Sequence, residues 1–302
     1  MINRLFGSKK RRTPDEQPEQ FGRAKPLEEI VNQRRYRTDI PYFFPKDINE
    51  QDRLNFQHYA LRHFLRGNYI APLAKIEIHD ILDVGSGSGI WPQEMAQEFT
   101  DAKVVGIDIE LPLSMSNMPR NSLLLQGNVL KGLPFQDEAF DFVHERLLAA
   151  AIPAQSWQPV VNELARVTRP GGFVEMIEVA DVFVNGGPNS LRLIDWWRQA
   201  GARTGFDSTP IKNLSILLTH AGITNITHTT LPIPMGKWAG RVGEMMSKDL
   251  HLVFNNLRVA CAKLGIASEK EYERTWEALP QEWERLQTSF VFFLAYGQKP
   301  QA

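Results

Sequence analysis

The sequence ILDVGSGSG, at residues 81–89, joins a short apolar segment to a turn that contains three glycines. Its apolar half has the composition of a buried β-strand, and the residues after the turn have helical spacing. Gly85, Gly87 and Gly89 allow the backbone to turn sharply, and they allow a ligand to approach main-chain groups that a Cβ atom would obstruct. The stretch therefore predicts a strand, a loop and a helix that together bind a nucleotide-like ligand.

An acidic residue stands at the end of the next predicted strand. The sequence VVGID, at residues 104–108, ends at Asp108, which lies about twenty residues beyond the glycine turn. A carboxylate at the end of a strand can accept hydrogen bonds from both hydroxyls of a ribose. The turn and the acid together predict a nucleoside-containing ligand more strongly than the turn alone.

The spacing of the glycines separates two classes of cofactor. Dinucleotide enzymes prefer G-x-G-x-x-G, because the third glycine brings the helix close to the strand while its N-terminus faces a pyrophosphate. Here the spacing is G-x-G-x-G, and Asp83 precedes the turn. A buried carboxylate at this place suits an amino group and would repel a diphosphate. S-adenosylmethionine, which carries an ammonium, a carboxylate and a ribose, therefore fits better than NAD.

From about residue 80 the chain alternates short β-rich segments with helical segments. Such alternation predicts βαβ units, a parallel sheet and right-handed crossovers. Strands of this region are expected at residues 80–84, 103–107, 122–126, 140–143 and 172–179, with helices beginning near residue 90 and at residues 158–168. Beyond Asp181 the pattern predicts further helices, a strand at residues 225–231 and a last strand at residues 289–296.

The chain is expected to form one catalytic domain that is preceded by a tail. Residues 1–26 are polar, partly basic and interrupted by prolines, so we expect them to be disordered. Helical periodicity is present on both sides of the alternating region. The domain at residues 27–302 therefore divides into a helical prelude (27–75), a cofactor-binding core (76–231), a helical lid insertion (232–286) and a last strand (287–299).

The bulk composition is that of an ordinary globular protein. Hydrophobic residues make up 43% of the chain, and a formal net charge of −1 gives no overall attraction to nucleic acid or anionic membrane. The single cysteine, Cys261, excludes an internal disulfide and suits a reducing compartment. No apolar run has the length of a membrane span, and the start lacks the apolar segment of a secretory signal. We therefore expect a cytoplasmic protein without a membrane partner.

Four segments together resemble the motifs of the class I S-adenosylmethionine-dependent methyltransferases. They are ILDVGSGSG, GIDIE, GNVLKGLPFQDEAFDFVHERLL and RVTRPGGFVEMIEV, at residues 81–89, 106–110, 127–148 and 166–179. The resemblance implies an α/β fold of Rossmann-like type. Such a fold has a seven-stranded, mostly parallel sheet with an antiparallel last strand, and helices cover both of its faces.

The same resemblance implies the residues that hold the cofactor. Gly85, Ser86 and Gly87 would line the methionyl part, and Asp108 would bind the ribose. The adenine would meet Ile109 on its face and Asn128 with Val129 at its edge, although the family more often has Asp at the position of Asn128. An amide oxygen can still accept from the adenine amino group. Further residues expected in the cofactor pocket are Asp83, Gly89 and Glu145.

Two longer segments are similar to the LaeA-like branch, which includes fungal regulators of secondary metabolism and natural-product enzymes. YFFPKDINEQDRLNFQHYAL, at residues 42–61, resembles the N-terminal segment of that branch, and residues 232–265 resemble its insertion. The resemblance implies an N-terminal helical extension and a helical lid inserted before the last strand.

Methyl transfer from a sulfonium is an in-line displacement, so the protein mainly supplies alignment and exclusion of water. If the acceptor is a hydroxyl, a base near the methyl group would help. The candidate catalytic residues are His144, just after the fourth strand, and His58 in the prelude.

The aromatic pair Trp196 and Trp197 could stack on an acceptor, although such pairs more often belong to a core. No metal site is expected, because no His or carboxylate cluster has ligand spacing.

The leading hypothesis is methylation of a small molecule. A nucleic-acid or protein methyltransferase is the alternative enzyme, although the basic cluster at residues 9–12 is the only nucleic-acid signal in the sequence. A non-catalytic, cofactor-binding regulator is a third possibility, since the LaeA-like branch includes regulators. An NAD-dependent oxidoreductase is the fourth. No short motif fixes the acceptor, the methylated atom or the oligomeric state.

Overall fold

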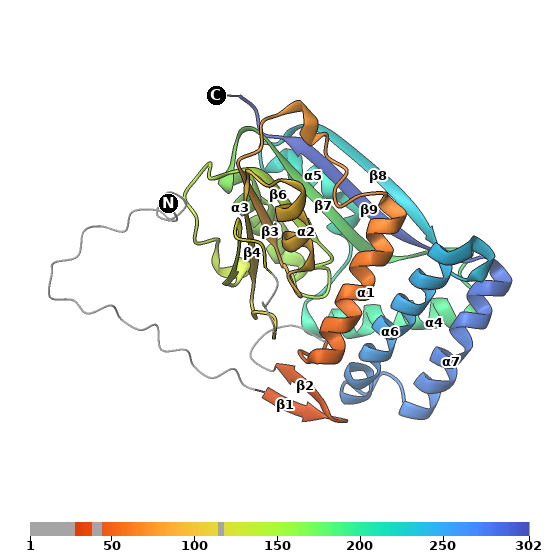
Figure 1. Ribbon diagram of the computed structural model, residues 1–302. Coiled ribbons are helices and arrows are strands. Elements are labelled where there is room, and N and C mark those ends of the chain that lie inside the picture. The colour runs from red at the N-terminus through yellow and green to blue at the C-terminus, as the bar shows by residue number, and fades with distance from the viewer. Residues whose placement is uncertain (1–27, 38–43, 114–117, 302) are drawn as a thin grey trace, which may run out of the picture.

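The computed structural model describes residues 28–37, 44–113 and 118–301 (Figure 1). The tail expected to be disordered, residues 1–26, lies outside the described residues. None of the described helices combines the length and the hydropathy that are needed to cross a membrane.

A seven-stranded sheet forms the centre of the domain, in the order β5-β4-β3-β6-β7-β9-β8 (Figure 1). Neighbouring strands from β5 to β7 are parallel, and β9 runs antiparallel to both β7 and β8. The expected fold is therefore confirmed. The strands are β3 (Asp80–Val84), β4 (Lys103–Asp108), β5 (Ser122–Gln126), β6 (Phe140–Arg146), β7 (Thr168–Val184), β8 (Thr224–Pro234) and β9 (Ser289–Gln298).

Helices cover both faces of this sheet. Strand alternation turns Leu82 and Val84 toward α3 (Trp157–Val167) and α5 (Leu214–His220), in one apolar core. It turns Ile81 toward α2 (Ile90–Glu98) on the other face. Short 3₁₀ helices complete the connections: η2 (Leu73–Lys75), η3 (Val129–Lys131), η4 (Ala154–Ser156), η5 (Ile211–Asn213) and η6 (Lys237–Ala239).

The chain before the sheet contains the expected N-terminal helix and, before it, a hairpin that was not predicted. It begins with a hairpin of β1 (Glu28–Val31) and β2 (Arg34–Arg37), which precedes the helix α1 (Ile48–Leu65). The turn residues Asn32 and Gln33 both have positive φ, as a tight two-residue hairpin requires. The hairpin was not predicted, because its turn lacks glycine and its two strands are mostly charged, so they show no apolar alternation.

The insertion between β8 and β9 is helical, as expected. It consists of α6 (Gly240–Lys263) and α7 (Glu269–Leu286), which pack against each other. They pack with α1 and α4 (Pro188–Thr204) over a second apolar core, in which Cys261 and Trp283 are fully buried. Figure 1 shows these helices beside the carboxyl ends of the central strands.

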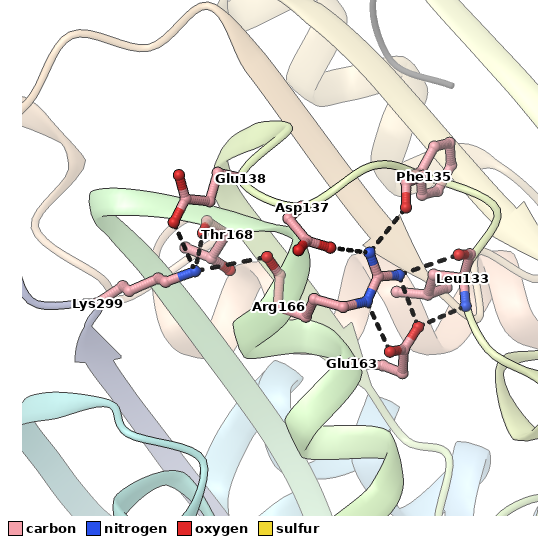
Figure 2. A network of polar contacts seen from close by, with 8 residues as sticks. All are labelled: Leu133, Phe135, Asp137, Glu138, Glu163, Arg166, Thr168 and Lys299. Atoms are coloured by element: carbon pink, nitrogen blue, oxygen red, sulfur yellow. Dashed lines mark hydrogen bonds and ion pairs between the residues drawn. The ribbon is translucent and has the colours of Figure 1, made fainter. Parts of the chain in front are cut away.

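A polar network fixes the opposite end of the sheet, where α3 joins β7 (Figure 2). Arg166 binds Glu163 through Nε at 2.7 Å and Asp137 through Nη1 at 2.8 Å. Its guanidinium also donates to the carbonyl oxygens of Leu133 and Phe135, at 3.1 and 2.8 Å. One side chain thus joins α3 to the loop that precedes β6.

Candidate functional site

A pocket lies at the carboxyl ends of β3, β4 and β6, where the strand order reverses and ligands bind in open α/β sheets. The walls include the glycine turn, the end of β4, the loop after β5 and the end of β6. Most of the predicted cofactor-binding residues line it, namely Asp83, Gly85, Ser86, Gly87, Asp108, Ile109, Asn128 and Val129. The candidate bases His58 and His144 line it as well.

The glycine turn has the backbone conformation that its sequence predicts. Gly85 and Gly87 have φ angles of +79° and +53°, which favour glycine. A Cβ atom on Gly85 would lie 2.5 Å from the side chain of Leu148. The N–H groups of Gly85 and Ser86 both donate to the carbonyl of Ile107, so the turn is attached to the neighbouring strand.

Asp108 is bound to the same turn. Its Oδ2 accepts from the N–H of Gly87 at 2.9 Å, its Oδ1 accepts from the N–H of Glu110 at 3.0 Å, and Lys46 Nζ lies 3.8 Å from Oδ1. Each carboxylate oxygen can accept two hydrogen bonds, so each retains a lone pair for a ribose hydroxyl. The residues present therefore fit the nucleoside part of S-adenosylmethionine.

Two predicted cofactor residues do not line the pocket. Gly89 ends the turn as the N-cap of α2, and a Cβ atom there would lie 2.7 Å from Leu124. Glu145 lies between His144 and Arg146 in β6, so strand alternation turns it to the opposite face. Its neighbour there is the buried Glu178, and burial raises the pKa of Glu145 well above its ordinary value.

Asn128 lines the pocket, but its side chain has a structural partner as well. Its Oδ1 accepts from the N–H of Leu130 at 3.0 Å and thereby caps η3. This cap fixes the loop that also carries Val129. Trp197 lines the pocket, whereas Trp196 stacks on Tyr272 in the core beneath the lid.

Asp83, His144 and Glu175 form a polar row across three neighbouring strands. They are register partners on β3, β6 and β7, so their side chains lie on one face of the sheet. His144 Nδ1 lies 2.8 Å from Asp83 Oδ1, and because a carboxylate accepts, Nδ1 carries the proton. His144 Nε2 lies 4.0 Å from Glu175, and the imidazole stacks on Trp91 with ring centroids 4.0 Å apart.

Burial sets the charge states in this row. It lowers the pKa of His144, against the opposing influence of Asp83, and it raises the pKa of Glu175 to about 7. Glu175 nevertheless accepts from the N–H groups of Ile70 and Ala71 at 2.8 and 2.6 Å. Both nitrogens of His144 therefore face carboxyl groups, and its contact with Asp83 holds that carboxylate beside the glycine turn.

His58 has partners on both ring nitrogens, whereas His144 Nε2 is buried and has no hydrogen-bond partner among the described residues. Its Nδ1 accepts from Arg146 Nη2 at 3.1 Å, and its Nε2 donates to Glu94 Oε2 at 3.0 Å. Burial lowers the pKa of His58 to about 4, so the ring is neutral near pH 7. Both nitrogens of His58 are thus occupied, and the unbound nitrogen of His144 lies beside Glu175.

The pocket continues from the glycine turn to an apolar compartment under the lid. We call this the apolar compartment, and its walls are Val179, Trp197, Ile233, Met235, Met246, Leu250, Val253, Phe290 and Phe292. One carboxylate lies among these side chains, that of Asp249 on α6. It accepts from Arg53 Nη1 at 2.9 Å and from Gln57 Nε2 at 2.8 Å, and burial raises its pKa.

Sequence reasoning missed four charged residues that line this pocket: Lys46, Arg53, Arg146 and Asp249. The sequence pattern could have revealed two of these residues, Arg146 and Asp249. Arg146 stands two positions after His144 and hence on the same strand face. Asp249 interrupts the apolar stripe that Met246, Leu250 and Val253 form on one helix.

Known proteins similar to this chain include methyltransferases and regulators of secondary metabolism. Residues 81–172 match the family described as a methyltransferase domain. Methyltransferase str2 of Strobilurus tenacellus is 26% identical over 84% of this chain and 95% of its own length. Methyltransferase pytC of Aspergillus terreus is 30% identical over 65% of this chain and 62% of its own length. The secondary metabolism regulator laeA of Coprinopsis cinerea is 32% identical over 45% of this chain and 35% of its own length.

The strand order, the glycine turn joined to Asp108, and these similarities agree with one another. The expected resemblance is confirmed, and S-adenosylmethionine is the cofactor of the fold. Residues 81–172 form a methyltransferase domain, and the chain is similar to fungal methyltransferases and to LaeA-type regulators of secondary metabolism.

Proposed function

We propose that the chain methylates a small, largely apolar acceptor of secondary metabolism, which binds in the apolar compartment. The single observation that carries this proposal is the continuity of the pocket, from the glycine turn to the apolar walls contributed by α6, β8 and β9. A neutral or aromatic molecule would gain from burial there. A nucleic acid would instead need a basic groove.

S-adenosylmethionine, when bound, supplies a methyl group on a positively charged sulfur. The protein then has to align the acceptor with that methyl group and exclude water. The helices α1 and α6 contribute to this by covering the pocket, and the Arg53–Asp249 ion pair joins them to each other. Asp249, which lines the pocket, would accept a hydrogen bond from a hydroxyl or amine of the acceptor. We also propose a cytoplasmic location, which the buried free thiol of Cys261 suits.

The test is methyl transfer from labelled S-adenosylmethionine in three separate arms: small aromatic hydroxyl and amine compounds, RNA, and protein. We expect transfer in the first arm. Leu250→Trp should fill the apolar compartment and lower this transfer at least about tenfold, with little change in the affinity for S-adenosylhomocysteine. The matched control is Leu252→Trp, which changes an exposed residue of the same helix.

Transfer confined to RNA or protein would contradict the proposal. Cofactor binding without transfer in any arm would favour the non-catalytic regulator instead. Equal activity of Leu250→Trp and Leu252→Trp would show that the acceptor binds outside the apolar compartment.

A further inference from the structure

Arg146 is a cationic side chain beside the glycine turn that the predicted cofactor site does not use. Arg146 is the last residue of β6, and the residue before it, Glu145, is the register partner of Val84 on β3. Arg146 therefore lies next to Gly85, the residue that follows Val84. Alternation along β6 places its side chain on the same face as His144, and both residues line the pocket.

The guanidinium of Arg146 is incompletely bound. Its Nη2 donates to a neutral imidazole, that of His58, rather than to a carboxylate. Its Nη1 is buried and has no hydrogen-bond partner among the described residues. A buried donor without a partner is unfavourable, and more so on a charged group. The position therefore calls for an anionic partner from the ligand.

The carboxylates around Arg146 already have other partners. Asp83 is bound to His144, Glu175 accepts from two backbone N–H groups, and Glu94 is bound to His58 and to Arg62. They favour the charged guanidinium electrostatically, as does Glu145. The Nη1 donor is consequently left for a group that enters the pocket.

The orientation of this guanidinium is fixed by a chain of hydrogen bonds. Arg62 Nη1 donates to Glu94 at 2.8 Å, Glu94 accepts from His58 Nε2 at 3.0 Å, and His58 Nδ1 accepts from Arg146 at 3.1 Å. His58 can accept from Arg146 only while Nδ1 lacks a proton. We infer that His58 is a positioning residue for Arg146.

We propose that Arg146 binds the carboxylate of the cofactor's methionyl part and that His58 orients its guanidinium for this contact. The methionyl end carries one positive and one negative group. Asp83 and Arg146, on the adjacent strands β3 and β6, offer the two opposite charges beside Gly85. An Arg–carboxylate pair is among the stronger hydrogen-bonded contacts in proteins. The proposal rests on the cofactor and is independent of the acceptor.

The test compares two ligands by calorimetric titration of the full chain. They are S-adenosylhomocysteine and its decarboxylated analogue, S-adenosyl-3-thiopropylamine, which lacks only the carboxylate. We expect the unaltered protein to bind the first at least about tenfold more tightly, since a charge-assisted hydrogen bond is lost in the second. Equal affinity for the two ligands would overturn the proposal without any variant.

Arg146→Met should remove this preference. Its affinity for S-adenosylhomocysteine should fall to that for the decarboxylated analogue, whose affinity should change by less than about twofold. Arg198→Met is the matched control, because this exposed arginine binds Asp181 and does not line the pocket, and it should retain the preference. Equal weakening of both ligands by Arg146→Met would indicate a structural role. Unchanged affinity for both would indicate that Arg146 serves the acceptor, and either result would overturn the proposal.

His58 is tested through the same preference. His58→Phe removes the acceptor for Arg146, so it should reduce the preference for S-adenosylhomocysteine and leave the affinity for the decarboxylated analogue unchanged. His58→Gln retains a carbonyl acceptor and should recover part of the preference. A preference that is the same in His58→Phe as in the unaltered protein would overturn the positioning role.

Discussion

The Oδ2 atom of Asp108 accepts a hydrogen bond from the backbone N–H of Gly87 at 2.9 Å. The acid at the end of β4 and the glycine turn after β3 are therefore one structural unit, although twenty-one positions separate the two residues. The carboxylate shapes the turn and also presents lone pairs to the pocket. A change at Asp108 should for this reason affect the cofactor site in two ways.

Asp108→Ala should weaken S-adenosylhomocysteine binding roughly 10- to 100-fold, because it removes the ribose contacts and releases the Gly87 N–H. Calorimetric titration measures this loss. The decarboxylated analogue, which retains the ribose, should be weakened by the same factor. A selective loss for one ligand would contradict a ribose contact at Asp108.

Glu175→Gln should change how stability depends on pH. The pKa of Glu175 is raised from 4.5 to about 7 in the folded protein. The folded state therefore holds an extra proton between these values, and its stability falls as pH rises through this window. The glutamine variant lacks this titration, and its stability relative to the unaltered protein should increase by roughly 3 kcal/mol from pH 4.5 to 7.5.

Urea unfolding at several pH values measures this difference, in which the titrations shared by the two proteins cancel. Glu273→Gln is the matched control, because this exposed glutamate lies on α7 and not in the sheet. The pH dependence of the stability difference should be larger for Glu175→Gln than for this control. A flat profile for Glu175→Gln would mean that the pKa of Glu175 is not raised in the folded protein.

Arg53 is expected to be critical for the contact between α1 and α6. Its guanidinium binds the buried carboxylates of Glu50 and Asp249 at 2.7 and 2.9 Å. Arg53→Met leaves both carboxylates uncompensated and should lower the free energy of unfolding by about 3–5 kcal/mol. Asp249→Asn leaves Arg53 bound to Glu50 and should cost only about 1 kcal/mol.

The triple variant Arg53→Met, Glu50→Gln, Asp249→Asn separates charge from packing. It buries no uncompensated charge, so chemical denaturation should show that it recovers much of the stability lost in Arg53→Met. If the triple variant is as unstable as Arg53→Met, the loss arises from the packing of the arginine stem instead.

Most of the sheet could be predicted from the sequence, because its strands are short apolar segments between recognisable turns. The hairpin at β1 and β2 could not be predicted, since charged residues such as Arg34 and Arg35 form it through contacts with distant partners. Arg34 binds Asp47, and Arg35 binds Glu110. These ion pairs exist only in the folded chain and leave no periodic pattern.

The part of the candidate site that is formed by the backbone of the glycine turn could be predicted from the sequence. Gly85 and Gly87 can be recognised in the sequence because a sharp turn and a nearby ligand both favour a residue without a side chain at these positions. Glu145 does not line the pocket, and the sequence could not show this, because the motif locates the end of the strand but does not tell which face of the sheet each residue is on. Arg53 and Asp249 were missed because α1 and α6 meet only after the domain has folded.

Arg166→Ala should separate stability from cofactor binding. The guanidinium joins α3 to the loop before β6 through Glu163, Asp137 and two backbone carbonyls (Figure 2). We expect a loss of about 2–3 kcal/mol in the free energy of unfolding, because several charge-assisted hydrogen bonds disappear together. Arg166→Lys retains the charge without the planar fork and should recover less than half of this loss.

The affinity for S-adenosylhomocysteine should not change in either variant, since Arg166 lies at the end of the sheet opposite the pocket. A weakened affinity in the folded variants would mean that the α3–β7 junction and the carboxyl end of β6 are coupled.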